Sequence, residues 1–117
     1  MEISGQAVLL RVFIGESDKI GHLPLYEAIV KEARSAGLAG ATVLKGVLGY
    51  GATARIRTAK LLDLSADLSM VIEIVDEEGK IDAFQPVLAE LFDQANCGGL
   101  VTLENIRVVH YLPEQEA

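Results

Sequence analysis

Cysteine, tryptophan and long apolar runs are scarce or missing in this sequence, and each absence excludes a class of protein. The chain of 117 residues has one cysteine, Cys97, so no disulfide can form within it, and a reducing compartment is expected. No apolar run approaches the roughly 18 residues that a membrane span needs. Residues 1–6 lack the basic start and hydrophobic stretch of a signal peptide. We therefore expect a cytoplasmic protein.

Positive charge is also scarce. The chain has 10 lysines and arginines against 17 aspartates and glutamates, a formal net charge of −7. Binding to nucleic acid needs a basic surface that displaces counterions from phosphates. The expected strand 68–75 also has no aromatic side chain on which RNA bases stack. We therefore expect no nucleic-acid partner, and RNA binding is the weakest of the alternatives.

Residue types that carry out catalysis or bind metals are few and scattered. His22 and His110 lie far apart in the sequence, and no histidine neighbours Cys97. No cysteine and histidine cluster has zinc spacing, and the acidic turns 16–18 and 76–78 lack the ligand count of a calcium loop. We expect no metal site and no catalytic residue within one chain. An enzyme would need groups from two chains, such as Glu73 or His110 with Asp18.

Hydrophobic periodicity predicts two similar halves. Alternation predicts a strand over 6–14, with one wholly apolar face, and further strands over 41–51 and 68–75. Helical spacing predicts one helix from Pro24 to Gly37 and a second over 80–95 that contains Pro86. Two short strands, 100–103 and 106–111, follow. This order predicts a single α+β domain over 1–117, a ferredoxin-like split βαβ sandwich whose antiparallel sheet carries both helices on one face.

The other face of that sheet needs a cover. Half of the residues are hydrophobic, which is a high share for a domain of this size. We therefore expect a partner subunit to cover the free face of the sheet. The tail 113–117 is expected to be flexible.

One constellation suits a ligand. Gly46, Gly49 and Gly51 crowd a strand end, and Arg55, Arg57 and Lys60 follow in a loop over 52–66. Glycines let a ligand approach backbone N–H groups, and arginines bind anions such as phosphate. The glycine spacing does not match a P-loop or a dinucleotide-binding fingerprint. The alternative is a solvated loop whose cations only aid solubility.

Three stretches together resemble the domain-of-unknown-function-190 family, a PII-like group. They are GLAGATVLKGVLGYGATARIRTAKLLDLSADLSMVIEIVD, PLYEAIVKEA and GGLVTLENIRVVHY, which cover nearly the whole chain. The resemblance to PII signalling proteins is more distant and consists of the element order and the strand VIEIV. The family resemblance implies a homotrimer with sheets packed inward and small-molecule effectors bound in clefts between subunits.

The resemblance also implies where each part of the cleft lies. The strand end, the base of the loop and the glycine turn after the second helix would form it. Tyr50, at the mouth of the loop, either stacks on the ligand or packs. The predicted ligand-binding residues are Gly46, Gly49, Tyr50, Gly51, Arg55, Arg57, Gly98, Gly99, Thr102 and Arg107.

Departures from the PII pattern limit what carries over. The PII glutamine that helps to hold magnesium and 2-oxoglutarate is replaced by Ala52 or Ala54, and a PII lysine by Ser69. The loop has no tyrosine to uridylylate, and the turn 98–102 is uncharged. An adenine nucleotide is the candidate effector by extrapolation. Because members of this family often sit beside genes for fluoride channels, a membrane transporter or channel is the candidate partner.

The leading hypothesis is a trimeric regulator. A small anionic metabolite or nucleotide would bind between subunits and order the 52–66 loop, which would engage or release a partner protein. The alternatives are a scaffold trimer that binds no small molecule and, less favoured, the enzyme with its site between subunits.

Overall fold

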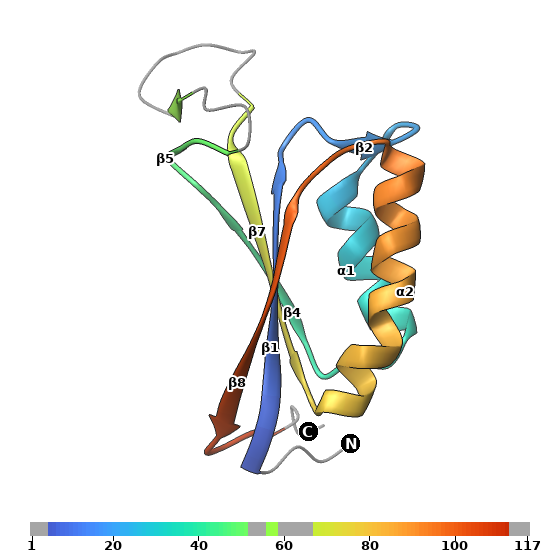
Figure 1. Cartoon of the computed structure of the whole chain (residues 1–117), viewed down its shortest axis with the longest axis vertical. Helices are drawn as coiled ribbons and strands as arrows, with labels where there is room; N and C mark the ends of the chain where they lie inside the picture. The colour runs from blue at the N-terminus through green and yellow to red at the C-terminus, as the bar shows by residue number, and fades with distance from the viewer. Residues whose placement is uncertain (1–4, 52–55, 59–66, 113–117) are drawn as a thin grey trace, which may run out of the picture.

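The fold is a four-stranded antiparallel sheet with both helices on one face. A computed structural model describes residues 5–51, 56–58 and 67–112 of the chain. The sheet contains β1 (Gly5–Gly15), β4 (Ala41–Lys45), β7 (Ser69–Asp76) and β8 (Leu100–Val108) in the order β4-β7-β1-β8. The helices α1 (Leu25–Ser35) and α2 (Glu78–Ala95) lie side by side against it (Figure 1). The predicted α+β, ferredoxin-like class is confirmed.

Two small sheets complete the described elements. β2 (Lys19–Ile20) pairs with β3 (Leu23–Pro24), and β5 (Leu48–Gly49) pairs with β6 (Arg57–Thr58). The second of these lies beyond the end of β4, next to the residues drawn in grey (Figure 1). Among the described residues, no helix is long and apolar enough to cross a membrane.

Alternation along the two central strands builds the core. In β1 and β7 every second side chain faces the helices, and the register places Leu10 opposite Ile74 and Val12 opposite Ile72. These four side chains are fully buried. The helices contribute Ile29 from α1 and, from α2, the group Ile81, Phe84, Leu88 and Leu91. The predicted apolar face of the first strand is therefore the core face.

The predicted strand over 41–51 is interrupted. The backbone N–H of Gly46 donates to the carbonyl of Ser69 at 2.7 Å, which turns the chain over the start of β7. A side chain at Gly46 would meet that carbonyl at 3.3 Å. The strand therefore ends at Lys45, and the next two residues to form a strand, Leu48 and Gly49, pair with β6 instead of β7.

The two predicted C-terminal strands are one. β8 continues through Glu104 and Asn105, which lie opposite Leu9 and Val8 of β1. In the sequence, these two polar residues favour a turn. They remain in the strand because β8 is at the edge of the sheet, where both side chains are exposed to solvent while the backbone pairs with β1.

Candidate functional site

An open hollow of about 500 Å³ lies on the helix-free face of the sheet, where β4 begins and β8 ends. Four apolar residues, Leu9, Val75, Ile106 and Val108, line it, and residues 39–42 form one side. Glu73, His110 and Tyr111 bring polar groups into it. A concave apolar site with a few convergent polar groups is the usual form of a small-molecule site.

The C-terminal segment closes one end of this hollow. β4 and β8 are opposite edges of the sheet, yet the hydroxyl of Tyr111, just past β8, donates to the carbonyl of Ala39, just before β4, at 3.1 Å. The chain after β8 therefore crosses the end of the free face. This crossing brings His110 into the wall of the hollow.

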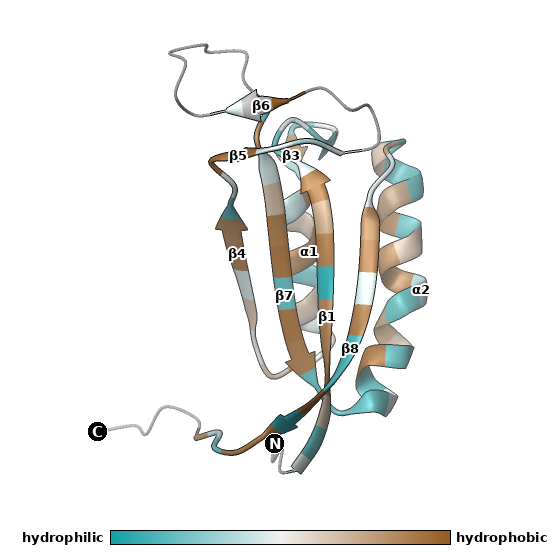
Figure 2. Cartoon of the chain, turned by 60° about the vertical axis from the view of Figure 1, so that its left-hand side comes forward, coloured by the Kyte–Doolittle hydropathy of each residue, from teal (hydrophilic) through white to brown (hydrophobic). Residues whose placement is uncertain are grey.

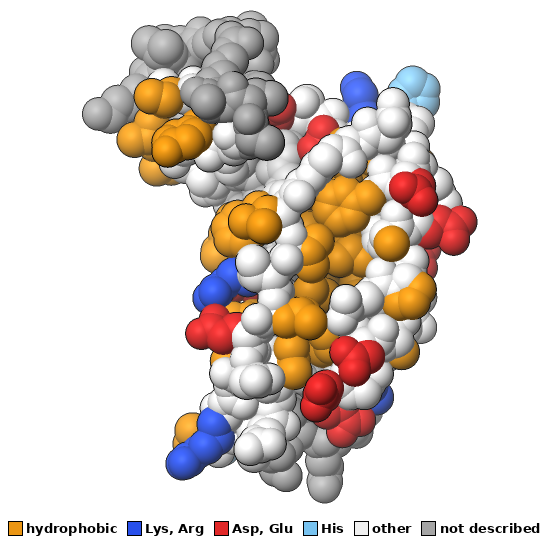
Figure 3. Space-filling model, viewed as in Figure 1, with side chains coloured by type: hydrophobic (Ala, Val, Ile, Leu, Met, Phe, Trp, Pro, Cys, Tyr) orange, Lys and Arg blue, Asp and Glu red, His pale blue; other side chains and the backbone are white. Residues whose placement is uncertain are grey.

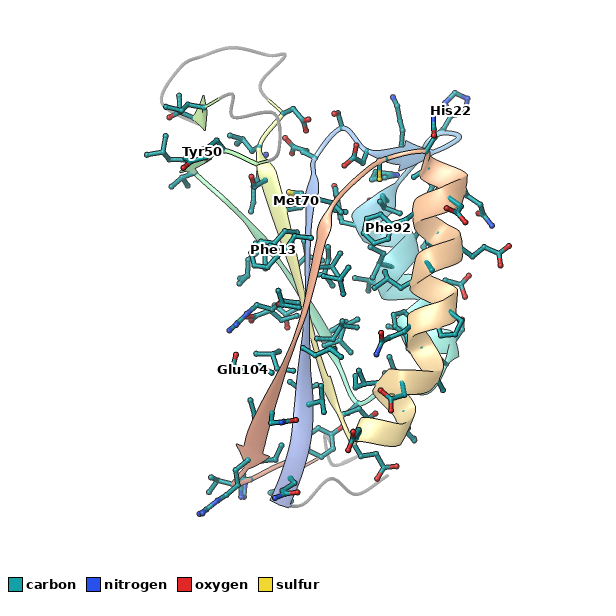
Figure 4. The ribbon with its side chains drawn as sticks, viewed as in Figure 1. Phe13, His22, Tyr50, Met70, Phe92 and Glu104 are labelled. Atoms are coloured by element: carbon teal, nitrogen blue, oxygen red, sulfur yellow. The ribbon has the colours of Figure 1, made fainter. Side chains whose placement is uncertain are left out.

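A charged triad crosses the middle of the same face. Arg11 Nε donates to Glu73 Oε2 at 2.7 Å, and Arg11 Nη1 donates to Glu104 Oε2 at 3.2 Å. Figure 2 shows it as a hydrophilic band across the otherwise hydrophobic β7 and β1, and Figure 4 places Glu104 on the side of the sheet away from the helices. The hydrogen bond to Glu73, with the charges of both carboxylates, raises the pKa of Arg11 above its ordinary value.

The predicted glycine-rich strand end lies at the far end of β4 from the hollow. Gly49 pairs with Arg57, so the base of the long loop does return to this strand end. Tyr50 is 70% exposed, and a side chain at Gly51 would meet open space. Arg55 lies outside the described residues. Of the predicted residues at this strand end, the backbone pairing joins Gly49 and Arg57.

The turn after α2 has a packing role of its own. A side chain at Gly99 would come within 2.7 Å of the Phe92 ring and 2.9 Å of the Phe13 carbonyl, whereas one at Gly98 would touch nothing. Asn96 ends α2 in the left-handed conformation, with φ of 51°. Gly99 thus lets the chain pass from α2 into β8 between a ring and the backbone of β1.

The structure does not bring all the predicted residues into one cleft of one chain. The strand end lies beyond β4 and the glycine turn leads into β8, and these strands form opposite edges of the sheet. Thr102 lies opposite Arg11 on the free face. Arg107 lies opposite Gln6, and eight strand residues place it about 26 Å from Gly99. Within one chain, the strand end after β4 and the glycine turn before β8 therefore stay on opposite edges of the sheet.

The groups considered for an enzyme are also separated. Glu73 and His110 both line the hollow. Asp18 lies at the other end of the sheet, where its carboxylate accepts from the N–H of Gly15, the residue opposite Ser69. Partial burial and then the charge of Asp18 raise the pKa of the Cys97 thiol, which makes it a poorer nucleophile. Within the described residues, no group of three or more metal-binding side chains forms a metal site.

Sequence reasoning missed the hollow. Its wall is made of ordinary strand residues, and only their register across β1, β7 and β8 brings them together. The available signals are Glu73, an acidic residue inside an apolar strand, and His110. On sequence grounds both are candidates only for an enzyme with its site between subunits.

Solved structures define the class of the fold as PII-like. CPII, a nitrogen regulatory PII-like protein from Thiomonas intermedia bound to ADP, AMP and bicarbonate, is similar at a TM-score of 0.63 and 17% identity, over 90% of each chain. A putative PII-like signaling protein from Thermus thermophilus is similar at 0.60 and 20% identity, over 92% of this chain and 94% of that one. At these identities the likeness extends to the fold alone.

The chain belongs to the DUF190 family (Uncharacterized ACR, COG1993), which residues 7–108 match. A UPF0166 protein of Aquifex aeolicus is 41% identical over 102 residues, which is 87% of this chain and 92% of the relative. Another UPF0166 protein, from Methanocaldococcus jannaschii, is 32% identical over 88% of this chain and 92% of its own length. The predicted membership of a PII-like family is confirmed.

Proposed function

We propose that this protein is a trimeric PII-like regulator, and not an enzyme, that binds an adenine nucleotide between subunits. The observation that carries the proposal is the hollow at the start of β4, on a face that one chain leaves open. Its apolar wall suits a planar base, and Glu73 supplies an acceptor for an amino group. That CPII is described as bound to ADP and AMP supports this choice of ligand for a chain of the same fold.

The length of β4 indicates how the bound nucleotide would be oriented along the sheet. From Ala41 to Lys45 the strand rises by about 13 Å, which is the reach of a nucleoside phosphate. A base in the hollow would therefore direct its phosphates towards the strand end at Gly46. The glycines there leave backbone room for an anion, and Arg55 and Arg57 would supply positive charge.

The trimer completes the cleft. The free face carries partly exposed apolar side chains, among them Leu44 of β4 and Leu100 of β8. A second copy that covers this face also brings its β8 edge, with Gly98, Gly99 and Thr102, towards the β4 edge of the first. This supports three clefts between subunits.

The long loop is the proposed signalling element. It starts at the strand end where phosphates would bind, so ligand binding would shift its population of conformers. Leu48 of the small sheet β5-β6 and the flanking residues Val47, Tyr50 and Ile56 have exposed apolar side chains, and these suit contact with a partner protein (Figure 3). Given the resemblance to its family, we propose a membrane transporter or channel as that partner.

Calorimetric titration of the purified protein with ATP, ADP, AMP and cyclic nucleotides, with and without magnesium, tests the proposal. We expect saturable micromolar binding of at least one adenine nucleotide, with one site per chain. Protein shown to be folded that binds none of them would contradict the nucleotide proposal. A scaffold trimer, or a sensor of a different metabolite, would then explain the fold better.

A further inference from the structure

Glu73 takes part in two features at once, because it lines the hollow and is also bound by Arg11. Arg11 Nε holds Glu73 Oε2 at 2.7 Å. Among the described residues, Glu73 Oε1 has no hydrogen-bond partner. Arg11 is not among the residues that line the hollow, so it binds one carboxylate oxygen of Glu73 from outside and leaves the other with accepting capacity.

The position of this carboxylate is set by rigid elements. Arg11 and Glu73 lie directly opposite each other on the two central strands, and their side chains are 37% and 30% exposed. A second guanidinium nitrogen binds Glu104 on β8, so Arg11 is tied to both neighbouring strands. Arginine presents its donors in a planar fork, so the arginine cannot turn without losing one of the two bonds. Glu73 keeps its hydrogen bond to Arg11 only while its carboxylate stays at this place on the sheet.

A fixed carboxylate distinguishes two kinds of purine. A carboxylate only accepts hydrogen bonds. The amino group on C6 of a 6-aminopurine donates to it, whereas the oxygen on C6 of a 6-oxopurine repels it. A 6-oxopurine also has a donor at the adjacent N1, and a carboxylate that was free to rotate would follow that shift.

We propose that Arg11 is a positioning residue that fixes Glu73, so that the hollow selects 6-aminopurine over 6-oxopurine nucleotides. This inference rests on the proposed function, because it names what determines the base specificity of the same site. Arg11 itself need not touch the ligand. Its role is to prevent Glu73 from adapting to the wrong base.

The test is the ratio of the affinities for AMP and IMP, measured by calorimetric titration of the full-length protein. We expect the wild type to bind AMP at least about tenfold more tightly than IMP, the size expected for one charge-assisted hydrogen bond. In Arg11→Gln the ratio should fall to within about threefold. In Glu73→Gln the preference should disappear, since an amide can also donate to the oxygen on C6.

The ratio reports on recognition, because partial unfolding lowers both affinities equally. Glu16→Gln is the matched control: it breaks the ion pair of Glu16 with Lys45, also 2.7 Å long, outside the hollow, and should leave the ratio unchanged. If Arg11→Gln does not fold, Arg11→Lys keeps the charge without the fork and should give an intermediate ratio.

The outcomes separate this inference from the proposed function. A wild type that binds AMP and IMP equally overturns the inference and leaves the nucleotide-binding proposal standing. An Arg11→Gln protein that keeps the wild-type ratio overturns the role of Arg11. A folded wild type that binds no purine nucleotide overturns both.

Discussion

At the residue scale, Gly99 shows how a residue predicted for ligand binding can be required by packing. An added Cβ would lie 2.9 Å from the carbonyl oxygen of Phe13 and 2.7 Å from the ring of Phe92. The ring can move, but the carbonyl belongs to the backbone of the central strand β1. Gly98, its neighbour, has nothing within 4 Å of the same position. The two glycines therefore provide a matched pair.

We expect Gly99→Ala to lower the free energy of unfolding by about 1 to 3 kcal/mol, the usual cost of overpacking. Gly98→Ala should change it by less than about 0.5 kcal/mol, as for an open surface position. Urea denaturation at a fixed protein concentration measures both. If the two substitutions lower the free energy of unfolding equally, the turn adjusts to the added Cβ and packing does not require Gly99.

At the element scale, α2 forms in spite of Pro86. The helix is continuous from Glu78 to Ala95, although proline has no N–H to donate to the carbonyl of Asp82. Pro86 is exposed, while Ile81, Phe84 and Leu88 pack into the core. Burial of this apolar stripe outweighs the missing backbone hydrogen bond. The hydrophobic spacing therefore determines that this segment is one helix, and the proline does not end it.

Replacing this proline should stabilise the protein. We expect Pro86→Ala to raise the free energy of unfolding by about 1 to 2 kcal/mol, because the restored bond outweighs the gain in unfolded-chain entropy. Glu90→Ala, at an exposed position of the same helix, is the control and should shift it by less than about 0.5 kcal/mol. If Pro86→Ala is instead less stable than the wild type, the packing of α2 against the sheet depends on the backbone shape that the proline gives the helix.

At the scale of the whole molecule, the free face of the sheet explains the high apolar content. Leu44 on β4 lies opposite Val71 on this face and is 49% exposed in the single chain. Phe13 of β1 points to the same side, away from the helices (Figure 4). A protein with such a face lowers its free energy by covering it, and the proposed trimer would cover all three faces together.

We expect the wild type to have the mass of three chains in light scattering coupled to size-exclusion chromatography. Leu44→Glu should give the mass of one chain, because association would bury a charge without a partner. Ala83→Glu, on the exposed surface of α2, should remain a trimer. A wild type that elutes as a single chain would contradict the trimer, and with it the clefts between subunits.

Most of the fold could be predicted because it depends on local patterns. The hydrophobic alternation persists over several residues in β1 and β7, and so does the helical spacing in α2. The order of these elements is compatible with few sheet topologies. The sequence could not predict the break at Gly46 or the unbroken β8. Both depend on partners distant in sequence, the Ser69 carbonyl for the first and the backbone of β1 for the second.

By itself, the sequence determined the fold class, the family and the glycine-rich strand end, since periodicity and continuous motifs carry that information. Only the tertiary structure placed Leu9, Glu73 and His110 around one hollow, and Arg11 between two carboxylates on different strands. These groups come from separate strands and from the segment after β8. Register and strand order bring them together, and both are set by packing between segments that are far apart in the chain.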